Sequence, residues 1–397
     1  MRPSSPAAEL AAPAVAPPRR RVLAVVSNFK WGHIDYLNAL ARRFDLRVAW
    51  SGEAHAGALA QATREGLSLV AVGRVADVGV AEVRSRLREE LAAWNPSVVH
   101  VMYYYHEALT VLARELVGDA AVVVHECRDP LTTLRSAAPG SELWRLEAEA
   151  LGASHGQVFV SRVLRGYLER AHGLDLGTSL IVPHAVAART LGPPAEKLSR
   201  RDGRVHLALV GTAAPLPDHS RYYVDIIRRL VSLGFVVHTH FHDLEGVSTA
   251  PYRALADELA DYHDHPSVSF RQGTLLSDLI SRYDLMGVFH ELTAGRVNEA
   301  ATLAVCMPTK AVCGWAHGAI PVVCFPHYGG IVEVIRELGV GFVVDDWEDL
   351  RRLGADRPAI AEATAACGRA RHRFTHEWQA DRLATFFDTL STPVPSA

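Results

Sequence analysis

Residues 21–51 read RVLAVVSNFKWGHIDYLNALARRFDLRVAWS and contain one complete structural unit. Its first end, RVLAVVS, is a short apolar run rich in valine, which is typical of a strand, and its second end, DLRVAWS, is also interpreted as a strand. The middle, IDYLNALARRF, repeats apolar residues at helical spacing. Strands buried on both faces of a parallel sheet are nearly continuous apolar runs. The stretch therefore predicts a strand, a helix and a second, parallel strand.

The same alternation continues along the first half of the chain. Further apolar runs, with helical patterns between them, predict strands at 67–73, 97–104, 120–127, 156–161 and 179–186. This alternation indicates a parallel sheet with helices on both faces. We predict a Rossmann-like domain at 21–187, preceded at 1–20 by a disordered tail rich in Pro and Ala.

The alternation breaks at 188–204, where ARTLGPPAEKLSRRDGR has the polar, Pro- and Gly-containing composition of a linker. It then restarts, with predicted strands at 206–211, 235–241, 268–273, 285–290, 320–325 and 341–345. These indicate a second domain at 205–356. The segment 357–397 holds a last helix and a tail, and this helix is expected to pack across both domains. The predicted fold class is α/β, with two Rossmann-like, doubly wound domains.

Composition excludes several classes of protein. With 49% hydrophobic and 21% charged residues, the 397-residue chain can bury two cores. A formal net charge of −3 gives no sign of the basic domain or stripe that nucleic-acid-binding proteins usually have, so we expect no nucleic-acid partner. The five cysteines lack CxxC and zinc spacings, which argues against a disulfide framework and favours a reducing cytoplasm. No run reaches the ~18 apolar residues of a membrane span, although Arg84, Arg86 and Arg88 leave peripheral membrane contact open.

Several motifs follow one another in an order that resembles a known family. Val210-Gly211-Thr212 ends a predicted strand, Pro308-Thr309-Lys310 opens a helix, and Gly329-Gly330 opens another. With GAIPVV at 318–323, VGFVVD at 340–345 and EAEALGASHGQVFVSRVLRGYL at 147–168, they resemble the GT-B glycosyltransferases, specifically glycosyltransferase family 4. The resemblance covers roughly residues 21–390. It implies two domains facing across a cleft, with the acceptor in the first and a nucleotide sugar in the second.

The resemblance gives Lys310 a role at the head of its helix. Pro308 suits a first helical turn, and the free amides and dipole of a helix start attract anions. The anion in the resembling family is the diphosphate of a nucleotide sugar, so Lys310 is a predicted catalytic residue that stabilises the leaving phosphate. A merely solvated lysine is the alternative. We expect a UDP- or GDP-linked sugar as substrate, and neither a cofactor nor a metal. The predicted donor-binding residues are Gly211, Thr212, Arg221, His240, Pro308, Thr309, Gly329, Gly330 and Glu333.

The first domain offers further candidates at the ends of its predicted strands. HECRD at 125–129 ends a central strand, where ligands bind in such sheets. His125 and Asp129 are predicted catalytic residues, because a histidine can take a proton near neutral pH. The alternative is a structural histidine and a helix-capping aspartate. In the loop after the first strand, Trp31, Gly32 and His33 are predicted acceptor contacts, with an ordinary turn as the alternative.

Two departures from the family pattern leave alternatives open. The paired glutamates of many members fall at Cys313 and near Val305 or Cys306, so both acids are missing. We predict transfer of a sugar, with the retention that the resemblance implies, to a small-molecule or lipid-linked acceptor. The missing acids keep open a GT-B-fold sugar-nucleotide epimerase, a pseudo-glycosyltransferase, or an inactive nucleotide-sugar-binding subunit.

Two polar clusters could suggest a metal. His238, His240 and His242 alternate along one predicted strand and so share a face. We interpret them as a strand end leading into the cleft. DDWED at 345–349 is interpreted as a helix cap with a solvated acidic turn.

Overall fold

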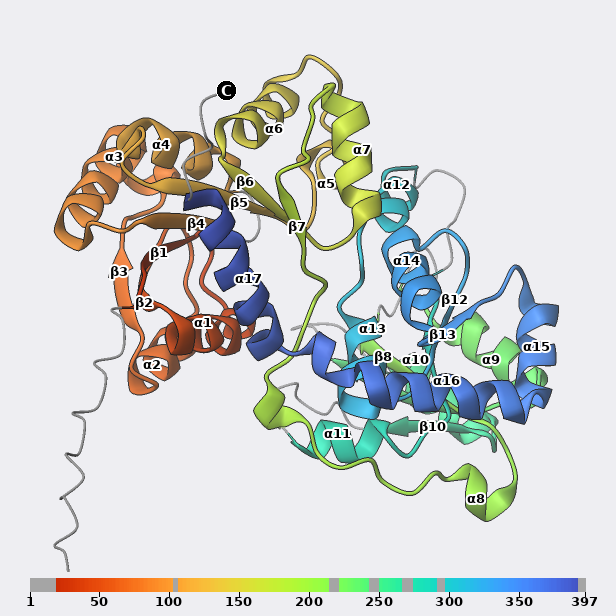
Figure 1. Cartoon of the computed structure of the whole chain (residues 1–397). Coiled ribbons are helices and arrows are strands. Elements are labelled where there is room, and N and C mark those ends of the chain that lie inside the picture. The colour runs from red at the N-terminus through yellow and green to blue at the C-terminus, as the bar shows by residue number, and fades with distance from the viewer. Residues whose placement is uncertain are drawn as a thin grey trace, which may run out of the picture.

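The computed structural model contains two parallel sheets, each with helices packed around it (Figure 1). It describes residues 19–102, 106–213, 221–242, 250–265, 274–290 and 297–391. Of the earlier predictions, most of the tail at 1–20 and the strand at 268–273 lie outside these residues. The two sheets confirm the predicted fold class, while the exact domain boundaries stay a prediction.

The first sheet has seven strands in the order β3-β2-β1-β4-β5-β6-β7. All its pairings are parallel, and Val22 of the interior strand β1 pairs with Leu46 on one side and Val98 on the other. The valine-rich runs form its buried interior, as the sequence predicts. The strands are β1 (Arg21–Val26), β2 (Asp45–Trp50), β3 (Ser68–Ala71), β4 (Val98–Met102), β5 (Val122–Cys127), β6 (Gly156–Phe159) and β7 (Ser179–Ile181).

The second sheet has six strands in the order β10-β9-β8-β11-β12-β13, again all parallel. The sequence pattern over 251–262 predicts a helix along that whole range, and this is wrong at its end: the helix ends at Glu258, and the edge strand β10 forms at Tyr262–His265. The strands are β8 (His206–Thr212), β9 (Val236–His242), β10 (Tyr262–His265), β11 (Leu285–Val288), β12 (Val322–Cys324) and β13 (Gly341–Val343).

Helices connect the strands of both sheets. Around the first sheet they are α1 (Trp31–Arg43), α2 (Ala56–Arg64), α3 (Val75–Trp94), α4 (Glu107–Val117), α5 (Leu131–Leu134), α6 (Glu142–Ala153) and α7 (Arg162–His172). Around the second they are α9 (Val224–Ser232), α10 (Ala250–Glu258), α11 (Thr274–Ile280), α12 (Val297–Val305), α13 (Lys310–Val312), α14 (Gly329–Leu338) and α15 (Trp347–Ala355). Asp346 caps α15 by accepting from two amides, as the sequence predicts.

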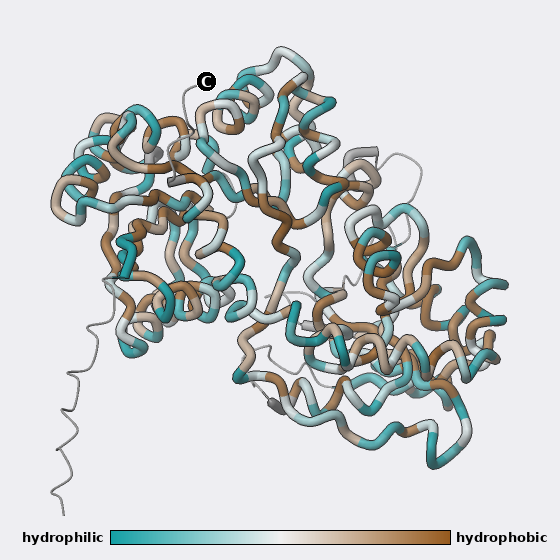
Figure 2. The backbone as a smooth tube through the Cα atoms, in the orientation of Figure 1, coloured by the Kyte–Doolittle hydropathy of each residue, from teal (hydrophilic) through white to brown (hydrophobic). Residues whose placement is uncertain are grey.

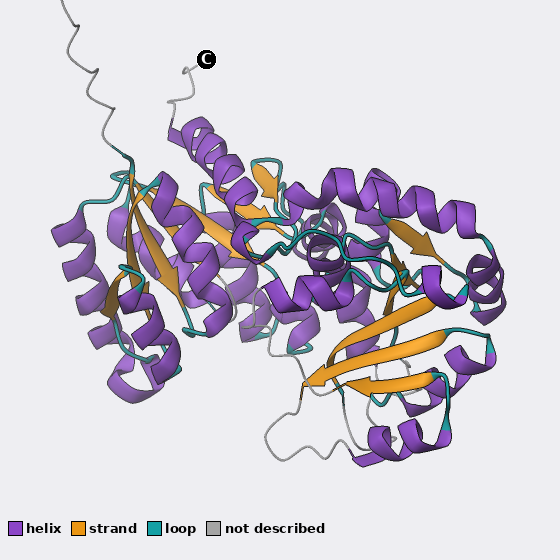
Figure 3. Cartoon of the chain, turned by 90° about the horizontal axis from the view of Figure 1, so that it is seen from below, coloured by secondary structure: helices purple, strands orange, loops and turns teal. Residues whose placement is uncertain are grey.

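The chain passes between the sheets twice. The linker carries the short helices η1 (Ala188–Thr190) and α8 (Ser199–Asp202). The predicted last helix is in fact two, α16 (Arg357–Ala370) and α17 (His376–Ser391), separated by a turn at Arg371–Phe374. The break occurs because Thr375 is extended and pairs with Val186 of the other passage. Helix α17 then packs against α1, while α16 packs beside α14 and β13. Figure 3 shows the strands and the surrounding helices from a second direction.

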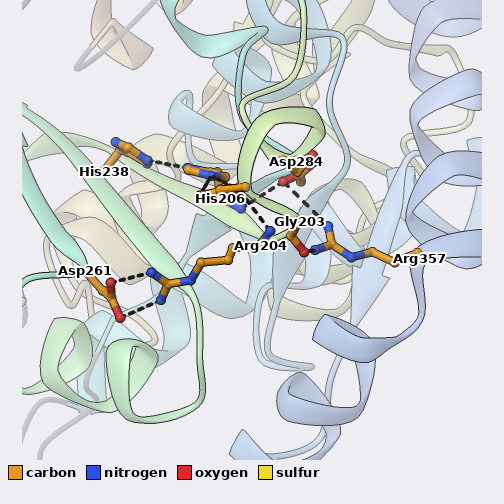
Figure 4. Close-up of polar contacts among 9 residues, drawn as sticks. Gly203, Arg204, His206, His238, Asp261, Asp284 and Arg357 are labelled. Carbon is orange, nitrogen blue, oxygen red and sulfur yellow. Dashed lines mark hydrogen bonds and ion pairs between the residues drawn. The ribbon is translucent and has the colours of Figure 1, made fainter.

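A polar cluster fixes the end of the linker to the second sheet (Figure 4). The guanidinium of Arg204 makes two hydrogen bonds of 2.5 Å to the carboxylate of Asp261. Arg357 of α16 donates to the carbonyl of Gly203 at 2.5 Å, and the His206 amide donates to Asp284 at 2.8 Å. The first strand of the second sheet is therefore anchored where the linker enters it.

Apolar side chains join the two halves. One buried cluster contains Phe159 of β6 and Leu164 of α7 together with Met286, Trp315 and Tyr328 of the second half. Figure 2 shows the hydrophobic segments concentrated in the sheets and inner helices. Within the described residues, no helix is both long and apolar enough to cross a membrane.

Candidate functional site

The second sheet has its topological switch point between β8 and β11. These strands are neighbours, but β8 continues to β9 on one side and β11 to β12 on the other. Ligands of open α/β sheets bind outside the carboxyl ends of the strands at such a point. Gly211 and Thr212 end β8, and His290 follows β11. Two predicted donor-binding residues thus lie where the fold favours a ligand.

The segment that carries Lys310 differs from the continuous α-helix expected. Helix α13 contains only three residues, and a π-helical segment, Cys313–Gly318, follows it. Pro308 lies before the helix, and its carbonyl accepts from the Ala311 amide at 3.1 Å. The anion attraction expected from a long helix is therefore smaller than the sequence suggests, since a helix dipole requires aligned peptides. The charge of Lys310 becomes the main feature of the site.

The Lys310 side chain extends across the switch point. Its ammonium donates to the Tyr223 hydroxyl at 2.8 Å and lies 3.1 Å from Nε2 of His290. The ammonium is also 5.4 Å from the centre of the Tyr223 ring. A Cβ on Gly211, which has a φ of +129°, would lie 3.9 Å from Cδ of Lys310. Lys310, Gly211 and His290 are thus brought together, and Lys310 is half-buried rather than directed into open solvent.

Gly329 and Gly330 are required by close packing. A Cβ on Gly329 would lie 2.1 Å from the carbonyl oxygen of Ala304, and one on Gly330 would lie 2.9 Å from that of Cys306. The start of α14 therefore sits directly on the chain that leads into Lys310. Tyr328, just before these glycines, is fully buried and bonds its hydroxyl to Nδ1 of His290 at 2.8 Å. A direct contact of either glycine with the donor stays a prediction.

Glu333 joins the two halves of the molecule. Its carboxylate accepts from the Arg162 amide at 3.1 Å and the Val163 amide at 2.9 Å, at the start of α7. The Arg162 guanidinium also reaches Glu333 at 3.2 Å. The acid thus caps a helix of the other half, as carboxylates do at helix N-termini. Both oxygens are used there, and its predicted role in donor binding is untested.

Asp129 lies at the junction with the second half. Its side chain hydrogen-bonds the thiol of Cys306, four residues before Lys310. The same thiol lies 3.7 Å from the carbonyl of Arg128. Burial raises the pKa of the Cys306 thiol, and the charge of Asp129 adds to that effect. The carboxyl end of β5 therefore contacts the segment that carries Lys310.

His125 lies inside the first half of the molecule. Its side chain is fully buried, bonds Thr110 at 2.8 Å through Nδ1, and stacks on His106 at 4.6 Å. Burial, assisted by the nearby His106, places its pKa well below the usual range. This environment matches the structural alternative considered for His125, and its catalytic role stays a prediction.

The sequence analysis did not single out two charged residues, Glu126 and Arg128, that lie between His125 and Asp129 in the chain. Glu126 and Arg128 are 1% and 4% exposed, and Arg128 Nε lies 2.5 Å from Glu126 Oε1. Tyr36 donates to the other oxygen at 2.9 Å, and His100 lies 3.0 Å from it. Burial would raise the pKa of Glu126, but the charge of Arg128 and the bond to His100 lower it overall. The sequence did hold a signal for this ion pair, because charged residues follow directly on the otherwise apolar run of β5.

The predicted acceptor contacts lie in a helix. Helix α1 begins at Trp31, so WGH forms its first turn instead of the expected loop. His33 is buried, its Nδ1 accepts from the Lys30 amide at 3.3 Å, and burial lowers its pKa to about 3. Trp31 packs against His55 with ring centres 5.5 Å apart, whereas Gly32 has open space around its Cα. Acceptor binding by these residues is untested.

The remaining donor candidates are His240 in β9, which pairs with Val210 next to Gly211, and Arg221 and Thr309, which lie shortly before α9 and α13. His240 is buried in β9, with Nε2 bonded to the Tyr283 hydroxyl at 2.9 Å. His238 bonds His206 at 2.8 Å, and the side chain of His242 lies outside the described residues. Arg221 is exposed, and Thr309 is exposed beside Lys310. In the part of the chain that the structure describes, no group of three or more His, Cys, Asp or Glu side chains has the geometry of a metal site.

Comparison with known proteins gives matches by structure alone. No protein-family model and no curated protein matches the sequence. A glycosyltransferase from Rickettsia africae ESF-5 superposes with a TM-score of 0.64 at 11% identity, covering 94% of this chain and 100% of that one. Anabaena Alr3699/HepE in complex with UDP gives 0.65 at 12%, covering 93% and 100%. Sucrose-phosphate synthase from Thermosynechococcus elongatus gives 0.62 at 13%, covering 94% and 99%.

These likenesses extend over nearly the whole chain, so they include both sheets and the passages between them. Assignment to family 4 stays a prediction. The chain has the fold of the GT-B glycosyltransferases.

Proposed function

We propose that this protein is a glycosyltransferase that moves a sugar from a nucleotide-diphosphate donor to a small-molecule or lipid-linked acceptor. The observation that carries the proposal is the Lys310 ammonium, held at the switch point of the second sheet by Tyr223 and His290. The complex of HepE with UDP, a protein of the same fold, supports a nucleotide ligand.

The chemistry of transfer suits such a cation. When the bond between sugar and phosphate breaks, negative charge develops on the leaving phosphate oxygen. An ammonium fixed beforehand stabilises this charge more than it stabilises the bound donor, which lowers the barrier. Losing such a contact typically slows a reaction by ~10² to 10³. The proposal includes retention of configuration, which the family 4 resemblance implies. In that chemistry the leaving phosphate assists deprotonation of the acceptor, so no protein nucleophile is required.

Nucleotide binding is the direct test. We expect UDP or GDP to raise the melting temperature of the wild-type chain, by an amount equivalent to ~2.7 kcal/mol at 100 times the dissociation constant. Lys310→Ala should abolish the rise. Arg200→Ala, at an exposed position on α8, serves as a charge-matched control that keeps it. Equal stabilisation of wild type and Lys310→Ala would contradict the proposed site.

A second candidate function rests on the positions of the missing acids. Cys313, and either Val305 or Cys306, stand where the resemblance places glutamates. Burial raises the pKa of Cys313 to about 12 and also raises that of Cys306, so neither thiol supplies a negative charge in place of the missing acids. A sugar-nucleotide epimerase or a pseudo-glycosyltransferase therefore remains the alternative. Incubation with a panel of nucleotide sugars separates the cases: transfer or hydrolysis releases nucleoside diphosphate, interconversion does not, and an inactive binding subunit gives neither.

A further inference from the structure

The contact between Lys310 and His290 fixes the state of the histidine. An ammonium has three N–H donors and no acceptor. The 3.1 Å contact between Lys310 Nζ and His290 Nε2 is therefore a hydrogen bond only when Nε2 offers its lone pair. The neutral imidazole must then carry its proton on Nδ1. His290 thus has one protonation state and one tautomer that suit Lys310.

The opposite side of the ring matches this tautomer. His290 Nδ1 lies 2.8 Å from the hydroxyl of Tyr328, which can accept the Nδ1 proton. Tyr328 is fully buried and directly precedes α14. The packing of that helix therefore holds the accepting hydroxyl in place. Tyr328, His290, Lys310 and Tyr223 form a continuous hydrogen-bonded chain across the carboxyl ends of β8 and β11.

We propose that His290 is a positioning residue that holds the Lys310 ammonium in the donor-binding geometry only while its imidazole is neutral. The inference rests on the proposed function. A protonated imidazole carries N–H on both nitrogens, cannot accept from Lys310, and places a like charge beside it. Acidification therefore releases Lys310 from the switch point and weakens binding of the donor diphosphate.

The surroundings of His290 come from three elements. In the described part of the chain, the titratable groups facing it are Lys310 from α13, Tyr328 at the start of α14 and Tyr223 at the start of α9, whose ring centre is 6.2 Å away.

The test is the pH dependence of nucleotide-sugar affinity. UDP-glucose and GDP-mannose serve as probes, because a diphosphate esterified at both ends lacks the phosphate ionisation near pH 6 that would confuse the result. We expect the wild-type dissociation constant to rise as the pH falls from 8 to 5.5, by at most about tenfold per pH unit, which is the limit for uptake of one proton. His290→Gln should remove this dependence, because its amide can accept from Lys310 and donate to Tyr328 without titrating.

Further variants make the outcome decisive. His290→Leu should bind both probes weakly at every pH. His327 packs on Tyr328 with ring centres 4.3 Å apart, and the control variant His327→Gln should keep the wild-type pH profile. If affinity rises on acidification, or if wild type and His290→Gln share one profile, the positioning role is wrong. If neither probe binds wild type at any pH, the proposed function itself fails. The two failures can be told apart by comparing wild type with Lys310→Ala. If wild type binds a probe and Lys310→Ala does not, the proposed function stands and only the role of His290 fails.

Discussion

Glu126 and Arg128 are buried side by side at the carboxyl end of β5, where the chain meets the segment before Lys310. Removing one partner of a buried ion pair leaves an uncompensated charge and typically destabilises by ~3–5 kcal/mol. We expect Glu126→Gln to lower the free energy of unfolding in urea by about this much. The surface substitution Glu149→Gln is the control and should have little effect.

Adding Arg128→Met to Glu126→Gln tests the cause. The double variant removes both charges, so it should be more stable than Glu126→Gln alone. A double variant that is less stable than the single one would show that the carboxylate matters for reasons other than its pairing with Arg128.

A second residue-scale prediction concerns Gly329, whose substitution is opposed by a backbone carbonyl. A Cβ there would lie 2.1 Å from the oxygen of Ala304, so the chain must shift to accept Gly329→Ala. Such overpacking typically destabilises by ~1–3 kcal/mol. Gly32→Ala is the matched control, because nothing lies within 4 Å of the added methyl group and alanine favours the helix by ~0.5–1 kcal/mol. Thermal or urea unfolding would compare them; equal effects would contradict the packing role.

At the scale of one element, strand β9 makes the fold sensitive to acid. Burial lowers the pKa of His238 to about 2 and that of His240 to about 3. Both are neutral in the folded state at pH 5.5, whereas in the unfolded chain they begin to take protons below pH ~6.5. The unfolded state then binds more protons, so stability falls as pH drops, by up to ~1.4 kcal/mol per pH unit for each group. Urea unfolding between pH 7.5 and 5 measures this.

The variant His240→Gln gives the contribution of one site. It should reduce the slope of stability against pH below 6.5, because one group fewer takes a proton on unfolding. A slope identical to that of wild type would mean that the acid sensitivity arises elsewhere, for example at His33 or His376, whose pKa values burial also lowers to about 3.

Elements differ in how far the sequence predicts them. The valine-rich strands were predictable because burial on both faces leaves a continuous apolar run, as in β1 and β4. β10 was not predicted because its sequence, YHDH, is polar, and His265 is instead packed against the histidines of β9. The π-helical segment after α13 has no sequence signature that we can identify. Lys310 and Gly211 were found from local motifs, but the partners of Lys310 come from α9 and β11 and needed the fold.

At the scale of the whole molecule, Glu333 on α14 connects the second half to α7 of the first. Hydrogen bonds to a charged group contribute ~1.5–3 kcal/mol when buried, and exposure of Arg162 reduces the benefit of its charge. We expect Glu333→Gln to lower the free energy of unfolding by about 1–2 kcal/mol. Glu362→Gln, an exposed change on α16, is the control. An unfolding free energy equal to that of wild type would mean that apolar packing alone joins the halves.

The pairing of Val186 with Thr375 has a mechanical consequence. The His376 amide donates to Val186 and the Val186 amide donates to Phe374, at 2.9 and 3.0 Å, so the outgoing and returning segments are tied at one place. A rotation of one half of the molecule against the other that leaves these hydrogen bonds intact would turn about this tie. Displacement would be small near it and grow with distance.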